Sequence, residues 1–425
     1  MRVLVVGSGG REHAIVWAVS RNRDVDKIYA APGNAGMSGL AECIPIEATD
    51  LETLADFARA NRVDLTIVGP EAPLALGITD VFAARGLKIF GPGRASAQIE
   101  SSKVFAKEFM KRHSIPTAQF SAFDSLEESL AFVRKRDGAL VIKADGLAAG
   151  KGVVIAQNSR EAEKALRSMM EDRSLGDAGA KVVIEELLEG PEVSVMALCD
   201  GETILPLAPA QDHKRAFDGD RGPNTGGMGA YSPVPVLDPP MMERVYSEIL
   251  VPTLEGLREE GIPYKGVLYA GLILTGDGPM VLEFNCRLGD PETQAVLPRL
   301  DGDLVSLAQA CVEGRLSEVA LHWKNEACVC VVAASAGYPG RYEKGKSISG
   351  LDRIKEHEDV LVFHAGTAFR DAGSGRKEIV TSGGRVLGVA ALGKDIETAR
   401  CRAYQAIKEI SFEGIFWRSD IASKR

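Results

Sequence analysis

The sequence predicts a multidomain protein of the α/β and α+β classes. Its 425 residues exceed one ordinary domain and indicate about two to four. Strand and helix patterns alternate in the N-terminal part, hairpin-linked strands fill the centre, and short β-rich segments follow Trp323. We therefore expect domains over residues 1–101, 102–322 and 323–425.

The composition narrows the classes of function. A formal net charge of -9 argues against a general binder of nucleic acid or of anionic membranes, because both need a broad basic surface. Seven cysteines, an odd number scattered along the chain, fit a reducing cytosol better than a disulfide framework. No apolar run has the length of a signal peptide or a membrane span. We expect a cytoplasmic protein.

The first domain opens with the β-branched run Val3–Val6, a glycine-rich turn and a helix. This geometry holds anions on free backbone N–H groups. A dinucleotide fingerprint fits poorly, because Glu12 replaces its third glycine and no acidic residue follows the second strand at 27–30. The pattern favours a small open α/β domain and disfavours an NAD-dependent oxidoreductase.

The central region begins with a helix that starts at Ser101–Lys103 and whose pattern ends at Pro116. Strands follow at 118–122, 140–143, 153–156 and 181–188, with a helix between the first and second and another between the third and fourth. A glycine-rich hairpin at 144–152 carries a lysine that can lie over phosphates. It is not a P-loop, because only three residues separate its glycines and a strand follows. A surface hairpin with one solvated lysine is the alternative. We expect about 122–188 to move as a lid.

The strand at 184–188 and the following Glu192 suggest a nucleotide contact. A strand that crosses between subdomains leaves backbone donors and acceptors free, and an adenine edge needs one of each. Glu192 can accept hydrogen bonds from ribose hydroxyls. The alternative is an ordinary connection whose carboxylates face water.

The most polar and glycine-dense loop covers 211–215 and 218–229. Long loops within compact domains are usually functional or disordered. Charges of both signs beside glycines that allow close backbone approach suggest a site for a zwitterion or an anion.

The strand at 281–288 presents two different faces. Alternation places Leu282, Phe284, Cys286 and Leu288 on an apolar face, and Glu283, Asn285 and Arg287 on a polar one. A carboxylate and an amide oxygen two residues apart are ligands that Mg²⁺ takes when it is shared with phosphates. The neighbouring arginine suits an anionic group. A strand with a solvated polar face is the alternative.

Taken in order, the lysine hairpin, the acidic hinge strand and the Glu-x-Asn strand resemble the ATP-grasp superfamily, whose members join a carboxylate to an amine with ATP. The segments most similar to the phosphoribosylamine–glycine ligase family of purine biosynthesis are 5–13, 211–215, 222–229 and 287–292. The resemblance covers nearly the whole chain. It departs at Leu288, where phenylalanine is common, and at Ala270–Gly271, where many superfamily members carry an acidic residue.

The resemblance implies an ATP-grasp fold between a Rossmann-like N-terminal domain and a small β-rich C-terminal domain. It implies ATP as co-substrate with Mg²⁺ or Mn²⁺, and small-molecule substrates, glycine and 5-phosphoribosylamine, with no nucleic acid or membrane as partner. We expect a monomer, with a dimer left open. The implied metal ligands are Glu283 and Asn285. The implied nucleotide contacts are Lys103, Lys143, Lys151, Glu185, Glu186, Leu187, Leu188 and Glu192. The implied catalytic residues are Asp212, Lys214, Arg287, Asp290 and Glu292. The implied substrate contacts are Gly9, Gly10, Asn224, Gly226 and Met228.

Two other classes stay open at this point. A different ATP-grasp ligase or carboxylase of nucleotide metabolism has the same nucleotide half and another acceptor. A non-catalytic nucleotide sensor binds ATP without turnover, but such a sensor gives no reason for the paired metal ligands.

Overall fold

The N-terminal part folds around a parallel five-stranded sheet of order β3-β2-β1-β4-β5. The structure is a computed structural model that describes residues 1–148, 152–354, 356–373 and 375–423. The run Val3–Val6 is fully buried in β1, as expected for a parallel sheet covered on both faces. The predicted open α/β domain is confirmed. Its elements are β1 (Arg2–Gly7), α1 (Gly10–Ser20), β2 (Lys27–Pro32), β3 (Glu42–Cys43), α2 (Leu51–Ala60), β4 (Leu65–Val68), α3 (Glu71–Leu76), α4 (Ile78–Ala84) and β5 (Ile89–Phe90).

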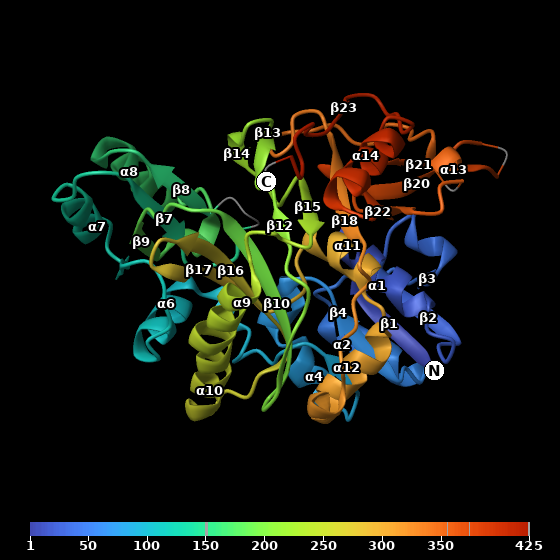
Figure 1. Cartoon of the computed structure of the whole chain (residues 1–425), viewed down its shortest axis with the longest axis horizontal. Coiled ribbons are helices and arrows are strands. Elements are labelled where there is room, and N and C mark those ends of the chain that lie inside the picture. Colours follow the sequence, from blue (N-terminus) through green and yellow to red (C-terminus); the bar gives the residue numbers. More distant parts are fainter. Residues whose placement is uncertain (149–151, 355, 374, 424–425) are drawn as a thin grey trace.

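Two helices, α5 (Gln98–Ser101) and α6 (Lys103–Arg112), lead into a four-stranded antiparallel sheet of order β6-β9-β7-β8. The Ser102 hydroxyl accepts the N–H of Phe105 at 3.1 Å and caps α6, at the predicted start. The sheet and its helices enclose their own apolar cluster and lie to one side of the molecule (Figure 1). The elements are β6 (Phe120–Phe123), α7 (Leu126–Val133), β7 (Leu140–Ala144), β8 (Val153–Ala156), α8 (Ser159–Leu166) and β9 (Val182–Glu186). The separate core suits a body that moves as one, and the lid motion stays a prediction.

The central sheet is antiparallel with the order β11-β10-β16-β17. The predicted hairpin between β16 and β17 is present, with Thr275 paired to Gly278. The side chain of Asp238 caps the helical run that begins at Pro239, as expected. The elements are β10 (Glu192–Asp200), β11 (Ile204–Pro206), α9 (Pro239–Val245), α10 (Val251–Glu259), β16 (Lys265–Thr275), β17 (Gly278–Asn285), α11 (Glu292–Val296) and α12 (Leu304–Glu313).

The C-terminal sheet has the order β12-β15-β18-β22-β19, with β23 paired to β18. It includes two strands, β12 and β15, that precede residue 323, so the polar loop is built into this sheet. One strand expected at 360–367 is divided, because the chain turns at Ala365–Gly366. The elements are β12 (Gln211–Asp212), β13 (Arg215–Phe217), β14 (Arg221–Asn224), β15 (Gly229–Ser232), β18 (Ala327–Ser335), α13 (Leu351–Ile354), β19 (Val360–His364), β20 (Thr367–Asp371), β21 (Lys377–Thr381), β22 (Arg385–Gly393), α14 (Ile396–Ile407) and β23 (Ile415–Phe416).

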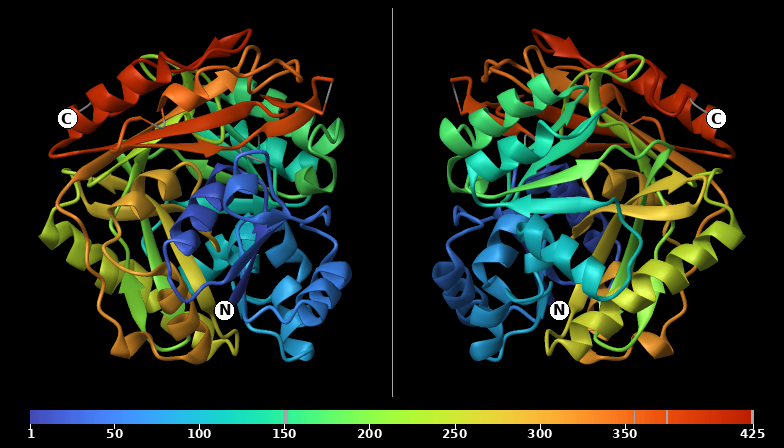
Figure 2. Two further views of the ribbon diagram at one scale, coloured as in Figure 1. Left: turned by 90° about the vertical axis from the view of Figure 1, so that its right-hand side faces the viewer. Right: turned by 90° about the vertical axis from the view of Figure 1, so that its left-hand side faces the viewer.

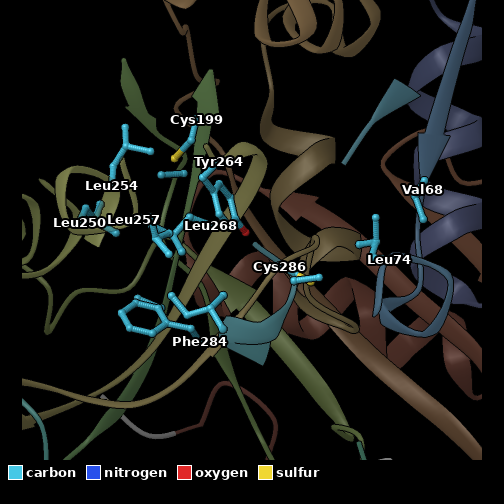
Figure 3. Packing of buried hydrophobic residues seen from close by; sticks show 14 of the residues in the cluster. Val68, Leu74, Cys199, Leu250, Leu254, Leu257, Tyr264, Leu268, Phe284 and Cys286 are labelled. Carbon is cyan, nitrogen blue, oxygen red and sulfur yellow. The ribbon is translucent and has the colours of Figure 1, made fainter. Parts of the chain in front are cut away.

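Shared apolar clusters join these units. One cluster contains Leu4 and Leu54 of the N-terminal domain together with Leu268 and Phe284 of the central sheet. Figure 3 shows Phe284 and Cys286 within it, beside Tyr264 and Leu268. In both views of Figure 2 the C-terminal elements lie above the N-terminal ones, and a second cluster spans this junction. Among the described residues, no helix combines the length and apolar character needed to cross a membrane.

Candidate active site

The strand β17 carries a β-bulge immediately before Glu283. Its pairing with β16 skips Leu282, so two residues oppose one and the alternation shifts. Val281 and Phe284 therefore both enter the buried cluster, while Leu282 stays half-buried outside it. The alternation expected from the sequence is wrong at Leu282. The rest of the apolar row is buried as expected: Phe284, Cys286 and Leu288.

The Glu283 carboxylate is half-buried and has no hydrogen-bond or ion-pair partner within the described ranges. Burial alone raises its pKa, but the positive charges of Lys214, Lys143 and Lys103 outweigh burial and lower it. The strand therefore presents an ionised carboxylate to a group of ammonium ions. Such surroundings suit a cation that is shared with phosphate oxygens.

Lys143 on β7 reaches across to this bulge. Its Nζ donates to the carbonyl of Leu282 at 2.8 Å. The same Nζ lies 3.0 Å from Glu185 Oε1, and Nζ of Lys107 lies 3.0 Å from Glu185 Oε2. The Glu185 side chain, which is 2 % exposed, thus lies between two lysines, and its Oε1 pairs with Lys143 by charge without a hydrogen bond of good geometry. Lys107 was not predicted from the sequence, where its only signal is its position one helical turn after Lys103.

Lys103 begins α6 and completes the group of lysines. Its Nζ donates to the carbonyl of Gly146 at 3.3 Å, which places it against the glycine-rich hairpin. Burial lowers the pKa of Lys103, as does the charge of Lys143, and Glu283 opposes both effects. The predicted Lys151 lies outside the described residues.

The hinge after β9 has the expected free backbone. Leu187 and Leu188 are half-buried, and their N–H and C=O groups make no hydrogen bond to any other described residue. The exposed Glu186 accepts the N–H of Gln119 at 2.8 Å through Oε1 and helps to fix this segment. The segment retains the donor and acceptor that an adenine edge requires.

The polar loop brings Asp212 and Lys214 next to Glu192 of β10. Nζ of Lys214 lies 2.8 Å from Glu192 Oε2, which joins a predicted catalytic residue to a predicted ribose contact. Burial raises the pKa of Asp212 to about 7, assisted by the charges of Glu292 and Glu192 and opposed by that of Lys214. No local sequence pattern indicates this contact between the two halves of the site.

Glu292 is buried at the start of α11, with an exposed fraction of 3 %. The Tyr269 hydroxyl donates to its Oε1 at 2.6 Å, and the Ser194 hydroxyl lies 3.2 Å from the same oxygen. Burial and the charge of Glu292 raise the pKa of Tyr269 well above its ordinary value. Tyr269 and Ser194 are functional candidates that sequence reasoning missed, since both sit in strands that read as ordinary core.

Arg287 is held by carboxylates of the N-terminal part. Its Nη2 lies 2.9 Å from Glu100 Oε1, and its Nε lies 3.3 Å from Glu71 Oε2. Its Nη2 also donates to Asn285 Oδ1 at 3.2 Å. The amide oxygen predicted to bind a metal thus already accepts one hydrogen bond, and its second lone pair stays available to a cation.

Arg385 of β22 ties the substrate-side loops together. Its Nη1 donates to the carbonyls of Gly226 and Asp290 at 2.6 and 2.8 Å, and lies 3.3 Å from the Asp290 carboxylate. Burial raises the pKa of Asp290, but the charges of Arg385 and Arg11 outweigh it and lower the pKa. Gly227 has a φ of +109°, and a side chain there would meet Pro291 at 2.4 Å. Part of the glycine run therefore serves close packing of two loops.

The predicted substrate contacts occupy different surroundings. Asn224 is half-buried opposite Arg215 in the β13–β14 hairpin. Met228 is completely buried in the C-terminal core, and its backbone N–H and C=O bond to His213 and Val332. The position of Met228 favours a packing role, and its predicted contact with substrate stays untested.

Gly9 and Gly10 lie at the start of α1, beside the Asp290 turn. The N–H of Gly9 donates to Glu12 Oε2 at 2.5 Å, so the carboxylate occupies the place that a nucleotide phosphate takes in a dinucleotide fold. A side chain at Gly10 would meet Gln294 Nε2 at 2.6 Å. The fold thus explains why Glu12 replaces a glycine, and the phosphate prediction for Gly9 and Gly10 stays untested.

The oxygen ligands on β17 suit a cation that takes its remaining ligands from outside the protein. In the described part of the chain, no group of three or more His, Cys, Asp or Glu side chains could hold a metal ion. Glu283 supplies one carboxylate that has no hydrogen-bond or ion-pair partner among the residues that the structure describes, and Asn285 supplies one amide oxygen on the same strand. Two protein oxygens suit Mg²⁺ that is shared with nucleotide phosphates and water.

Comparison with known proteins places all three parts of the chain in one family. The models of the phosphoribosylglycinamide synthetase N domain, ATP-grasp (A) domain and C domain match residues 1–100, 101–293 and 328–424. A phosphoribosylamine–glycine ligase of Caldanaerobacter subterraneus is 51% identical over 423 residues, covering 100% of both chains.

Solved structures agree with this assignment. The crystal structure of a phosphoribosylamine–glycine ligase from Thermotoga maritima superposes with a TM-score of 0.86 at 36% identity, covering 99% of this chain and 100% of the other. The biotin carboxylase domain of 2-oxoglutarate carboxylase from Hydrogenobacter thermophilus, solved with MgADP and bicarbonate, shares the fold with a TM-score of 0.71 at 16% identity, covering 98% and 91%. The chain therefore belongs to the phosphoribosylglycinamide synthetase family of ATP-grasp ligases.

Proposed function

We propose that this chain joins glycine to 5-phosphoribosylamine with ATP, giving glycinamide ribonucleotide, ADP and phosphate in purine biosynthesis. The observation that carries the proposal is the Glu283 carboxylate among Lys103, Lys143 and Lys214, which has no hydrogen-bond or ion-pair partner among the described residues. The Asp212 carboxylate lies near it, and Glu292 in turn lies near Asp212. The lysines and Glu283 suit a triphosphate with its cation, and the Asp212 and Glu292 carboxylates suit an amine. Family membership supports the same pair of substrates.

On this proposal, adenine lies against the free backbone of Leu187 and Leu188, and the ribose lies near Glu192. Lys103 and Lys143 hold the phosphates. Mg²⁺ or Mn²⁺ at Glu283 and Asn285 would neutralise phosphate charge as the two anions approach. The site needs no covalent bond to the protein, because positioning and charge neutralisation supply most of the rate enhancement.

The proposed reaction proceeds in two steps. A carboxylate oxygen of glycine attacks the γ-phosphorus of ATP, which gives glycyl phosphate and releases ADP. The amine nitrogen of 5-phosphoribosylamine then attacks the glycyl carbonyl carbon, phosphate leaves, and the nitrogen loses one proton. Asp212 is suited to take that proton, because a base with a pKa of about 7 is effective near neutral pH.

The remaining residues position substrates. Lys214 and Arg287 supply positive charge near the carboxylate of glycine, and Asp290 with Gly9, Gly10, Asn224 and Gly226 lies toward the phosphoribosyl group. Closure of the lid over 122–188 would keep water from the acyl phosphate. We also expect the protein to act as a cytoplasmic monomer.

The test is a product assay with purified protein, ATP, Mg²⁺, glycine and freshly formed 5-phosphoribosylamine. ADP release that requires both glycine and the amine supports the proposal. ADP release that needs only one of them, or a different acceptor, favours another ATP-grasp reaction. Tight ATP binding with no ADP under any combination favours a sensor.

A further inference from the structure

We propose that Lys107 is a positioning residue for the nucleotide site: it orients Lys143 through Glu185 and fixes the bulge before Glu283 through Thr117. The inference rests on the proposed nucleotide site and assigns a role to a side chain that does not contact the nucleotide. Lys107 lies in the middle of α6 and is 2 % exposed. It therefore acts only through the side chains that it contacts.

The first contact is with Glu185. Each carboxylate oxygen of Glu185 has its own lysine: Oε2 lies 3.0 Å from Nζ of Lys107, and Oε1 lies 3.0 Å from Nζ of Lys143. Side-chain exposure is 2 %, 2 % and 7 % for Lys107, Glu185 and Lys143. Water is thus largely excluded from this row of charges. Without Lys107, the carboxylate would be free to rotate toward Lys143 and draw it away from the phosphates.

The second contact is with Thr117. Nζ of Lys107 donates to Thr117 Oγ1 at 2.7 Å, and that hydroxyl donates to the carbonyl of Val281 at 2.6 Å. Lys143 donates to the carbonyl of the next residue, Leu282. Both lysines therefore hold the two-residue bulge that sets the direction of Glu283.

The network crosses between two bodies of the fold. Lys143 and Glu185 belong to the lid sheet, on β7 and β9, whereas Val281 belongs to the central sheet on β17. Lys107 on α6 contacts Glu185 of the lid sheet directly and is linked to Val281 of the central sheet through Thr117. A buried ammonium is costly unless it is paired and hydrogen-bonded, and here each partner lies next to a residue proposed to meet phosphate or metal. A core position that served packing alone would be filled at lower cost by an apolar side chain.

The main experiment compares Lys107→Met with the wild-type chain in steady-state kinetics. Methionine keeps the length and apolar stem but removes the charge. We expect KM for ATP to rise by at least about tenfold, the scale of one lost hydrogen-bonded ion pair. KM for glycine should stay within about threefold, because the acceptor half does not contact Lys107. Lys111→Met, an exposed lysine on the same helix, is the matched control and should leave both constants unchanged.

A double variant tests the route. If Lys107 acts through Glu185, KM for ATP of Lys107→Met/Glu185→Gln should exceed that of Glu185→Gln by no more than about threefold, the share that the Thr117 route carries. Multiplication of the two single effects would overturn this route. A lower melting temperature of Lys107→Met with unchanged KM for ATP would show a merely structural role.

If Lys107→Met does not fold, Thr117→Val is the second test of the inference. Valine keeps the shape of threonine and removes only the hydroxyl that links Lys107 to the carbonyl of Val281. A rise of about threefold in KM for ATP supports the inference, and an unchanged value overturns it. The wild-type product assay separates these results from the proposed function. Wild-type ADP release that needs glycine and the amine, combined with a normal KM in the variants, contradicts the role of Lys107 alone.

Discussion

Neutralising Glu283 should abolish most turnover without loosening the fold. The variant Glu283→Gln keeps the shape of the side chain and removes one negative charge. The carboxylate makes no hydrogen bond or ion pair to other residues in the described ranges, so the substitution breaks none within those ranges. Its effect is confined to the group of lysines and to whatever cation and phosphates bind there.

The size of the effect follows from the charges. Two opposite unit charges about 4 Å apart interact by about 4 kcal/mol at an effective dielectric constant of about 20. A water molecule that replaces the lost carboxylate as a ligand of the cation offsets part of this loss. A loss of about 2.7 kcal/mol in the transition state lowers the rate by about two decades. We therefore expect kcat to fall by at least about 100-fold.

The assay is ADP release at saturating ATP and glycine, with the melting temperature measured on the same preparation. Asp277→Asn is the matched control, because Asp277 is an exposed carboxylate in the turn of the same hairpin. It should keep full activity. A Glu283→Gln protein that melts much earlier yet retains its specific activity would refute the argument and make Glu283 a structural residue.

Three further predictions concern other parts of the site. The raised pKa of Asp212 means that the carboxylate gains its charge only above about pH 7, so kcat/KM should fall about tenfold per unit below that pH, and Asp212→Asn should show low activity without this acid limb. An acid limb that persists in Asp212→Asn would assign it to another group. Tyr269→Phe removes the 2.6 Å hydrogen bond to Glu292 and should lower the free energy of unfolding by about 1.5–3 kcal/mol in urea denaturation, whereas no change would mean that the bond contributes nothing. Amide exchange in 122–188 should slow when a non-hydrolysable ATP analogue binds, and equal exchange with and without it would count against the lid.

The sequence located the chemistry well where a local pattern carries it. Turn glycines and β-branched runs predicted the N-terminal sheet, and the strand period placed Glu283, Asn285 and Arg287 away from the core. The period failed at Leu282, because a bulge is a pairing defect between two strands and depends on the partner strand. Glu12 departs from a nucleotide fingerprint in the sequence itself, but its contact with the N–H of Gly9 arises only in the folded chain.

Contacts between distant segments were decided by the tertiary structure. Arg385 reaches loops that lie 95 or more residues earlier in the chain, and Lys107 meets Glu185 across two elements. A lysine in a helix and an arginine in a strand read as solvated side chains until the partner carboxylates are placed beside them. Local residue types fixed which groups can bind a triphosphate and a cation, since that depends on chemistry and short spacing. Burial and long-range pairing set their ionisation and direction, because the charges that shift a pKa come from whichever segments the fold brings together.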